Sequence, residues 1–191
     1  MKLPQLGVAL VCLTLALSGG ARADDDLIVP GVSIGKMRLG SDGADQLSSL
    51  PKPAAIDAGM SQTRQVWVEN NGGSKETLFV HTTANGATDT KPVDGVTIDL
   101  IRVTASYFRT RTELRTGSTL GQVLLVYPDC RPLDDENRIY DDSKQGIAFE
   151  FDPHPNFRSP CIAIMIHPPG RPNYATQEQV QSILDSGASG G

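Results

Sequence analysis

The sequence is poor in aromatic residues, cysteine and histidine, and it has no long apolar run beyond its N-terminal segment. Aromatic side chains make up 5% of the chain, which has three cysteines and three histidines. The absence of a later apolar run long enough to span a bilayer predicts that no transmembrane helix follows the N-terminal segment. The 17 basic residues form no cluster and are outnumbered by 22 acidic ones. Nucleic acid is therefore not an expected partner.

The N-terminal segment 1–23 has the pattern of a secretory signal peptide. A basic start is followed by an apolar stretch at 7–17 and by small residues that form a cleavage site at Ala23. The apolar stretch is too short to cross a bilayer. Cys12 lies inside this stretch instead of at its end, so we do not expect a lipid anchor. The sequence predicts a periplasmic or secreted protein, cleaved near Ala23.

Cleavage at Ala23 leaves two cysteines, Cys130 and Cys161. An even pair of cysteines in an exported chain most simply forms a disulfide. Such a bond would close a loop of roughly 30 residues and stabilise the fold by about 3 kcal/mol. The alternatives are two free thiols or a metal pair, although no further ligands lie nearby at zinc-finger spacing. We expect the disulfide.

One short pattern occurs twice in the chain. Leu39-Gly40-Ser41 and Thr116-Gly117-Ser118 are each followed by apolar residues seven and ten positions after the glycine, and by a proline at position eleven. The serine of each copy is the expected N-cap of a helix. Pro51 and Pro128 prevent the two helices from continuing. The second copy has the clearer apolar stripe.

Strand patterns follow each predicted helix. Residues 63–69 and 76–82 alternate on either side of a turn at 70–73 and predict a β-hairpin. The alternation within 96–106 breaks between Leu100 and Ile101, which indicates a bulge or a strand buried on both faces. Further strands are expected at 138–140, 146–151 and 160–167.

These elements predict an α+β fold of two tandem modules, each a short helix followed by about three antiparallel strands. We expect the modules to share one curved sheet with the helices on one face. The first module spans 24–110, the second 111–170, and a C-terminal tail 171–191. Thr176 and Gln179 predict a capping box that begins a short helix in this tail.

The patterns "LGS…L..LPKP" and "TGS…L..YP…P", followed by "Y…..GIAFEF", resemble two small repeat families. One is the SmpA/OmlA family of small outer-membrane assembly lipoproteins. The other has the fold of the β-lactamase inhibitor protein, with helices on one face of a curved antiparallel sheet. The resemblance covers roughly two thirds of the mature chain and implies protein-binding modules without chemistry of their own. The low aromatic content and the lack of an anchoring cysteine depart from these families, so neither lactamase inhibition nor outer-membrane assembly is carried over.

Motifs for catalysis and metal binding are weak. Gly31-Val32-Ser33-Ile34-Gly35 matches the hydrolase pattern G-x-S-x-G, but no strand and helix units precede it to hold Ser33 on a sharp turn. His81, His154 and His167 have no histidine or cysteine neighbour at metal-ligand spacing. The acidic runs do not fit the EF-hand register. We expect no catalytic residue, no metal and no cofactor.

The sheet is the expected functional surface. If Cys161 turns toward the helices to reach Cys130, the alternate isoleucines of 162–166 lie on the open face. Aligned apolar side chains on an open face usually mark a contact site. The alternative is that the tail helix, a loop or a second copy covers them. The candidate binding face comprises Trp67, Phe79, Ile162, Ile164 and Ile166.

The sequence thus predicts an exported, non-enzymatic protein-binding or envelope-associated module. Its partner would be another protein or an envelope component. Two alternatives remain open. One is a small secreted hydrolase that uses Ser33 or a histidine site, and the other is a structural envelope protein that self-associates.

Overall fold

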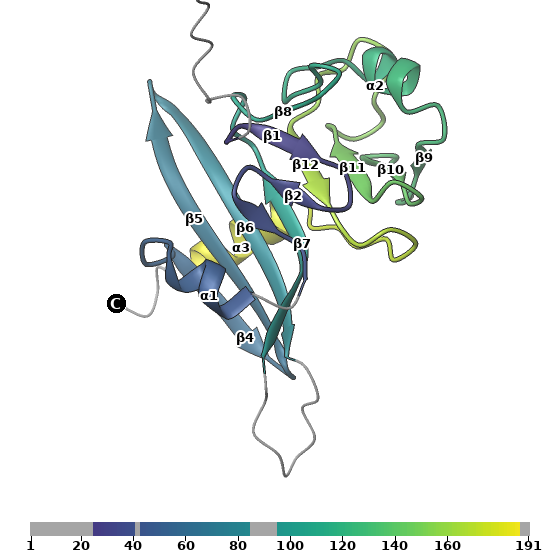
Figure 1. Cartoon of the computed structure of the whole chain (residues 1–191). Coiled ribbons are helices and arrows are strands. Elements are labelled where there is room, and N and C mark those ends of the chain that lie inside the picture. Colours follow the sequence, from purple (N-terminus) through teal and green to yellow (C-terminus); the bar gives the residue numbers. More distant parts are fainter. Residues whose placement is uncertain (1–24, 41–42, 85–94, 188–191) are drawn as a thin grey trace, which may run out of the picture.

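The computed structural model describes residues 25–40, 43–84 and 95–187. This part of the chain is mostly β structure, arranged as one eight-stranded and one four-stranded sheet with three short helices (Figure 1). The predicted signal peptide at 1–23 and the predicted cap at Ser41 lie outside the described residues.

The larger sheet is antiparallel throughout, with the strand order β4-β5-β6-β7-β12-β11-β10-β9. Its longest strands are β5 and β6, which form the tall hairpin in Figure 1. The strands are β4 (Ala55–Gly59), β5 (Gln62–Asn71), β6 (Ser74–Ala84), β7 (Val96–Val103), β9 (Arg131–Pro132), β10 (Ile139–Asp142), β11 (Ile147–Glu150) and β12 (Ala163–Ile166).

The β5–β6 hairpin predicted from the sequence is present, with a tighter turn than expected. Asn71 pairs with Ser74, so Gly72 and Gly73 alone form the turn, with φ of 56° and 90°. Two positive φ angles fit a two-residue hairpin turn and favour glycine at both positions. A bulge in β7 is also present, but at Asp99 and not between Leu100 and Ile101 as predicted, because His81 pairs with Leu100 and Thr82 with Ile98.

The smaller sheet was not predicted. It consists of β1 (Leu27–Val29), β2 (Ser33–Ile34), β3 (Met37–Arg38) and β8 (Arg109–Thr110), in the order β3-β2-β1-β8 with β1 and β8 parallel. Strands of two or three residues are too short to show an alternating pattern. The turn between β2 and β3 includes Gly35, where φ is 54° and an added Cβ would lie 2.4 Å from the Asp25 carbonyl oxygen.

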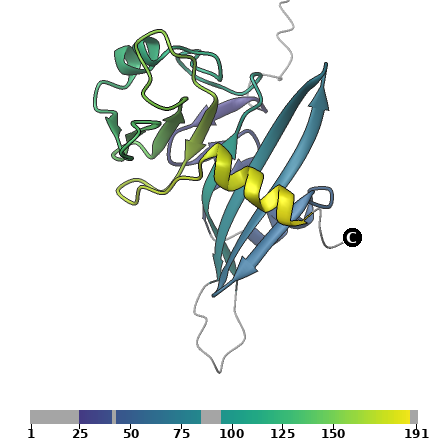
Figure 2. The same cartoon turned by 180° about the vertical axis from the view of Figure 1, so that it is seen from behind.

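The helices cover both faces of the large sheet. Figures 1 and 2 show α1 (Gly43–Ser48) in front of the β4–β6 strands and α3 (Gln177–Gly187) behind them. The first core cluster contains buried side chains of α2 (Leu120–Val126), of the small sheet and of one face of the large sheet. The second cluster lies between the other face and α3. The sheet is therefore the middle layer of the molecule.

Capping side chains define the starts of α2 and α3. Thr119 caps α2 and exchanges hydrogen bonds with Gln122, so the cap lies one residue after the predicted Ser118. The predicted capping pair of α3 is present, since the Thr176 backbone N–H donates to Gln179 Oε1 at 2.9 Å. None of the three described helices is long and apolar enough to cross a membrane.

The predicted fold class, two tandem modules of a helix and about three strands sharing one sheet, is wrong. The described residues form two sheets instead of one, and α3 lies on the opposite face of the large sheet from α1 and α2. The start of the predicted first module, before its helix, supplies three strands of the smaller sheet. The prediction failed because an amphipathic tail helix and a set of very short strands each bury apolar surface that the repeat pattern does not reveal.

A buried ionic network fixes α3 to the sheet. Arg102 of β7 donates from Nη2 to Glu150 Oε2 of β11 at 2.6 Å and to Gln177 Oε1 at 2.8 Å. Glu150 Oε1 in turn accepts from the Gln177 backbone N–H at 2.6 Å. The Arg102 and Glu150 side chains are 0% and 1% exposed. Each charge is therefore paired in a region that excludes water.

Candidate functional site

The five residues predicted as one binding face do not lie together. Trp67 faces the first core cluster and Phe79 the second, because they occupy alternate pleats of the β5–β6 hairpin. Ile164 and Ile166 are 0% exposed within the first cluster. Ile162 is half-buried and precedes β12. Of the five, Trp67 and Phe79 line pockets, and these are different pockets.

The expected isoleucine face is buried because both faces of β12 are covered, one by the first cluster and the other by the second. Strand β12 begins at Ala163, not at Pro160. Cys161 and Ile164 both belong to the first cluster, although a regular strand would place residues three apart on opposite faces. Met165 faces α3 in the second cluster.

Cys130 and Cys161 are free thiols in the structure, which gives the predicted disulfide no support. The Cys161 thiol donates to the Ala163 carbonyl oxygen at 3.0 Å, and the Cys130 thiol to the Tyr140 carbonyl oxygen at 3.9 Å. Burial raises the pKa of each thiol to about 12. Such thiols remain protonated and are poor nucleophiles.

The serine and histidines considered for hydrolysis lie in separate parts of the fold. Ser33 is buried in β2 of the small sheet. His81 Nδ1 bonds to Asp99, and His81 Nε2 lies 3.3 Å from Gln62 Oε1. His167 Nε2 lies 2.6 Å from Asp141 Oδ1 and its Nδ1 lies 3.0 Å from the Pro168 carbonyl oxygen. The ring nitrogens of both histidines are thus engaged by groups other than Ser33.

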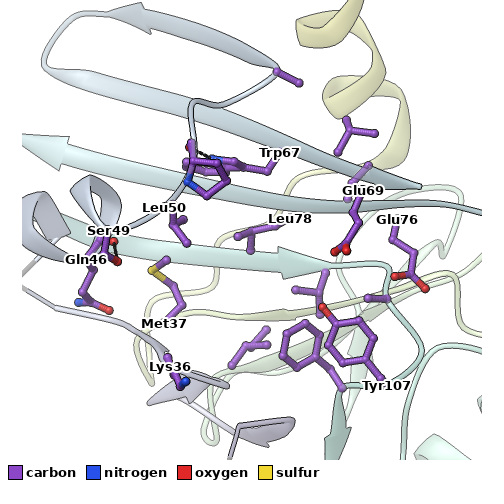
Figure 3. A pocket seen from close by; sticks show the side chains of 18 of the residues that line it. Lys36, Met37, Gln46, Ser49, Leu50, Trp67, Glu69, Glu76, Leu78 and Tyr107 are labelled. Carbon is purple, nitrogen blue, oxygen red and sulfur yellow. Dashed lines mark hydrogen bonds between the residues drawn. The ribbon is translucent and has the colours of Figure 1, made fainter. Parts of the chain in front are cut away.

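A groove of about 780 Å³ lies between the large sheet, α1 and the small sheet, and we call it the α1 groove. Figure 3 shows its side chains from close by. Its volume falls in the range of pockets that hold one small molecule. It is lined by residues of β2, β3, α1, β5, β6 and β7 and of the segments after α1 and β7.

The floor of the α1 groove is an apolar row across three strands. Trp67 pairs with Leu78, and Leu78 pairs with Val103. All three side chains belong to or pack against the first core cluster. The Trp67 indole donates from Nε1 to the Pro51 carbonyl oxygen at 2.7 Å. This bond joins the floor to the segment after α1 and fixes the plane of the ring.

The wall opposite the floor comes from α1 and β3. Met37 and Leu50 extend toward the floor residues in Figure 3. Gln46 of α1 holds this wall together, because its Oε1 accepts from the Arg38 backbone N–H at 2.7 Å and its Nε2 donates to the Arg38 carbonyl oxygen at 3.3 Å. These two bonds fix α1 to β3 along the wall.

The two ends of the α1 groove differ in charge. Glu69, Glu76 and Tyr107 lie at one end, and Lys36, Gln46 and Ser49 at the other (Figure 3). Lys36 Nζ forms an exposed ion pair with Asp25 at 3.1 Å. The pKa of Tyr107 is raised, first by its burial and then by the negative charges of Glu69 and Glu76 and of Asp26.

A second, more polar pocket of about 640 Å³ lies between the large sheet and α3. His81, Asp99 and Thr83 line it, and the Thr83 hydroxyl donates to Asp99 Oδ2 at 2.6 Å. Asp99 thus accepts from both neighbours. Within the described part of the chain, no group of three or more histidine, cysteine, aspartate or glutamate side chains is arranged to hold a metal ion.

The sequence predicts Trp67 as a site residue, but it does not predict Glu69, Glu76 and Tyr107 at the acidic end of the groove. The sequence prediction places 70–73 in the turn and assigns Glu69 no partner across the hairpin. The true turn has two residues, so Glu69 lies opposite Glu76 and Trp67 opposite Leu78. The Gly72-Gly73 pair was the signal that favours the shorter turn. Tyr107 had no such signal, because it follows β7 in a loop.

No protein-family model matches the chain, and no curated protein matches it. The resemblance to the SmpA/OmlA and inhibitor-like families therefore stays a prediction. Among solved structures, the uncharacterized protein yfeY from Escherichia coli is similar to this chain, with a TM-score of 0.38 and 14% identity over 73% of this chain and 98% of that chain.

Proposed function

We propose that this chain is an exported, non-catalytic binding module that holds the apolar part of an envelope component or of a partner protein in the α1 groove. The supporting observation is the groove itself, with an apolar floor of Trp67 and Leu78 and charged or polar groups at both of its ends. Ligand pockets commonly combine a mostly apolar lining with a few placed polar groups.

The hydrogen bonds of the groove walls support this proposal. Gln46 ties α1 to β3, and Trp67 is tied to Pro51. A preformed site loses less conformational entropy on binding than one that must be ordered. The hydrolase alternative has weaker support, because Ser33 lies in a strand of the small sheet and the ring nitrogens of His81 and His167 are already engaged.

Trp67 provides the test, because it is the single tryptophan of the chain and lines the groove. We expect its fluorescence to change saturably as octanol, a neutral apolar probe, is titrated. Leu50→Gln places an amide in the groove wall and should weaken octanol binding about fivefold to tenfold, through lost apolar contact. Leu125→Gln is the matched control, since Leu125 is 83% exposed on α2 and does not line the groove.

Two outcomes of the octanol titration would contradict the proposed function. If octanol leaves Trp67 fluorescence unchanged below the concentration that unfolds the protein, the groove does not bind apolar ligands and the proposed function is wrong. Equal weakening by Leu50→Gln and Leu125→Gln would place the octanol site elsewhere and would also contradict it.

A further inference from the structure

Two glutamates face each other at the acidic end of the α1 groove without a cation between them. Glu69 of β5 and Glu76 of β6 are directly opposite in the register of the hairpin. Like charges at such positions destabilise a sheet. Among the salt bridges of the described residues, none includes Glu69 or Glu76. The hairpin thus carries a repulsive pair at a position that lines a pocket.

One oxygen of this pair also lacks a hydrogen-bond donor. Glu76 Oε2 is buried and has no partner in the structure, and it is the one such side-chain atom among the described residues. A buried acceptor left without a donor costs about 1–3 kcal/mol, and more when it is charged. Both the repulsion and this cost would be relieved by a cationic donor placed at this end of the groove.

Two aromatic rings also lie at the acidic end of the α1 groove. Tyr107 and Phe108 follow β7, and their ring centroids lie 4.4 Å apart. Both residues line the groove, and Tyr107 lies beside the two carboxylates in Figure 3. Aromatic faces attract cations through their quadrupole, which adds to the attraction of the carboxylates. Glu76 Oε2 is itself shielded from water, which strengthens charge attraction at this atom.

We infer that the α1 groove binds a small amphipathic amine, with the ammonium group between Glu69 and Glu76 and the apolar body over Trp67 and Leu78. The inference rests on the proposed function and adds the charge of the ligand to it. The groove volume of about 780 Å³ suits one small molecule better than a folded partner. Two lysines, Lys36 and Lys52, also line the groove, and Lys36 is paired with Asp25.

Three probes with the same alkyl chain test the inference: octylammonium, octanol and octanoate, each titrated against Trp67 fluorescence at low salt. We expect octylammonium to bind about tenfold or more tightly than octanol, because a hydrogen bond to a charged group adds that much affinity. Octanoate should bind no better than octanol. Raising the salt concentration should weaken octylammonium binding and leave octanol binding unchanged.

Glu76→Gln and Glu69→Gln test the residues. Each should reduce the preference for octylammonium over octanol severalfold and leave the affinity for octanol within about twofold. Each should also raise the urea midpoint of the ligand-free protein, because like-charge repulsion is removed. Asp135→Asn is the control, since Asp135 is exposed in the loop before β10 and the same charge is lost far from the groove.

Two results separate failure of the inference from failure of the proposed function. If octanol binds but octylammonium binds no more tightly, or if both glutamate variants keep the full preference, the amine inference is wrong and the proposed function stands. A preference for octanoate would likewise overturn the inference, by placing the ligand head at the lysine end. If none of the three probes binds, both proposals are wrong.

Discussion

His167 and Asp141 form a buried pair that joins the segment after β12 to β10. Both side chains are 0% exposed, and His167 Nε2 lies 2.6 Å from Asp141 Oδ1. His167 Nδ1 faces the Pro168 carbonyl oxygen at 3.0 Å, and a carbonyl can only accept. Burial alone would lower the pKa of His167, but the hydrogen bonds to Asp141 and Pro168 outweigh burial and raise it above 6.5. Both ring nitrogens therefore donate, as in an imidazolium.

The raised pKa predicts how stability depends on pH. Because the folded protein holds this proton more tightly than the unfolded chain, His167 stabilises the fold fully below about pH 6.5. This stabilisation is lost as the pH rises through the raised pKa of the folded state. The free energy of unfolding of the wild type should therefore exceed that of His167→Gln most at about pH 5.5, and the difference should shrink toward pH 9. Urea unfolding at a series of pH values measures it.

His154 supplies the control for this pH dependence. It is exposed in the loop after β11, so His154→Gln should leave the pH profile of stability unchanged. A difference between wild type and His167→Gln that stays constant from pH 5.5 to pH 9 would show that folding does not change the pKa of His167, and one that grows with pH would show that the histidine is neutral when folded.

At the scale of elements, α3 depends on the Arg102–Glu150 pair as well as on apolar contact. Arg102→Met would leave Glu150 buried with its charge unpaired. Removing one partner of a buried ion pair costs about 3–5 kcal/mol. We expect a loss of stability of that size in urea unfolding, with α3 amides losing protection in hydrogen exchange first, because Glu150 also accepts from the Gln177 N–H.

Arg64→Met is the matched control for Arg102→Met. Arg64 pairs with Asp57 at 2.9 Å, but both side chains are 47% exposed. Exposed ion pairs contribute about 0–1 kcal/mol, so this variant should be nearly neutral. A double variant, Arg102→Met with Glu150→Leu, should recover much of the lost stability because no buried charge remains. Equal effects of the two arginine variants would contradict the special role of the buried pair.

The elements that the sequence predicts well are those with a strong local signal. The β5–β6 hairpin has alternating strands and a Gly72-Gly73 turn, and α2 has a complete apolar stripe and a capping box. The small sheet has no local signal, because its strands are two or three residues long and their pairing with β8 joins distant segments. Which face a residue covers depends on where each strand begins, as β12 shows.

The candidate site was predictable only in part, for the same reason. Trp67 stands out as the single tryptophan on an alternating strand. The groove beside it is formed by α1, the small sheet and the segment after β7, which meet through tertiary packing alone. The sequence places no apolar groove there, and it suggests an open sheet face, although the first cluster covers its isoleucines and α3 covers the other face.

At the scale of the whole molecule, both faces of the large sheet are covered by other parts of the chain. The first core cluster fills one face and the second fills the other, so a flat sheet surface is not left for a partner. The α1 groove lies where the small sheet and α1 leave part of β5 and β6 uncovered. In this architecture we expect a ligand to bind at the edge between the large sheet and the layer formed by α1 and the small sheet, where apolar side chains remain accessible.

The cysteines give a whole-molecule test of both maturation and oxidation state. We expect the chain, expressed with its N-terminal segment in a bacterial host, to be recovered from the periplasm with a mass that begins at Asp24. Cys12 would leave with the signal peptide, so Cys130 and Cys161 should be the two thiols that iodoacetamide modifies after unfolding without reductant. In the native protein neither should react in the same time, because burial raises both thiol pKa values to about 12.

Intact-mass measurement separates the outcomes of this experiment. Two adducts after unfolding agree with the free thiols of the structure. No adduct until a reductant is added, with a mass two hydrogens lower, would show that the Cys130–Cys161 disulfide forms in the oxidising periplasm and that the free-thiol arrangement is wrong. Three adducts on a chain that begins at Met1 would show that segment 1–23 is retained, and export with cleavage near Ala23 would then be excluded.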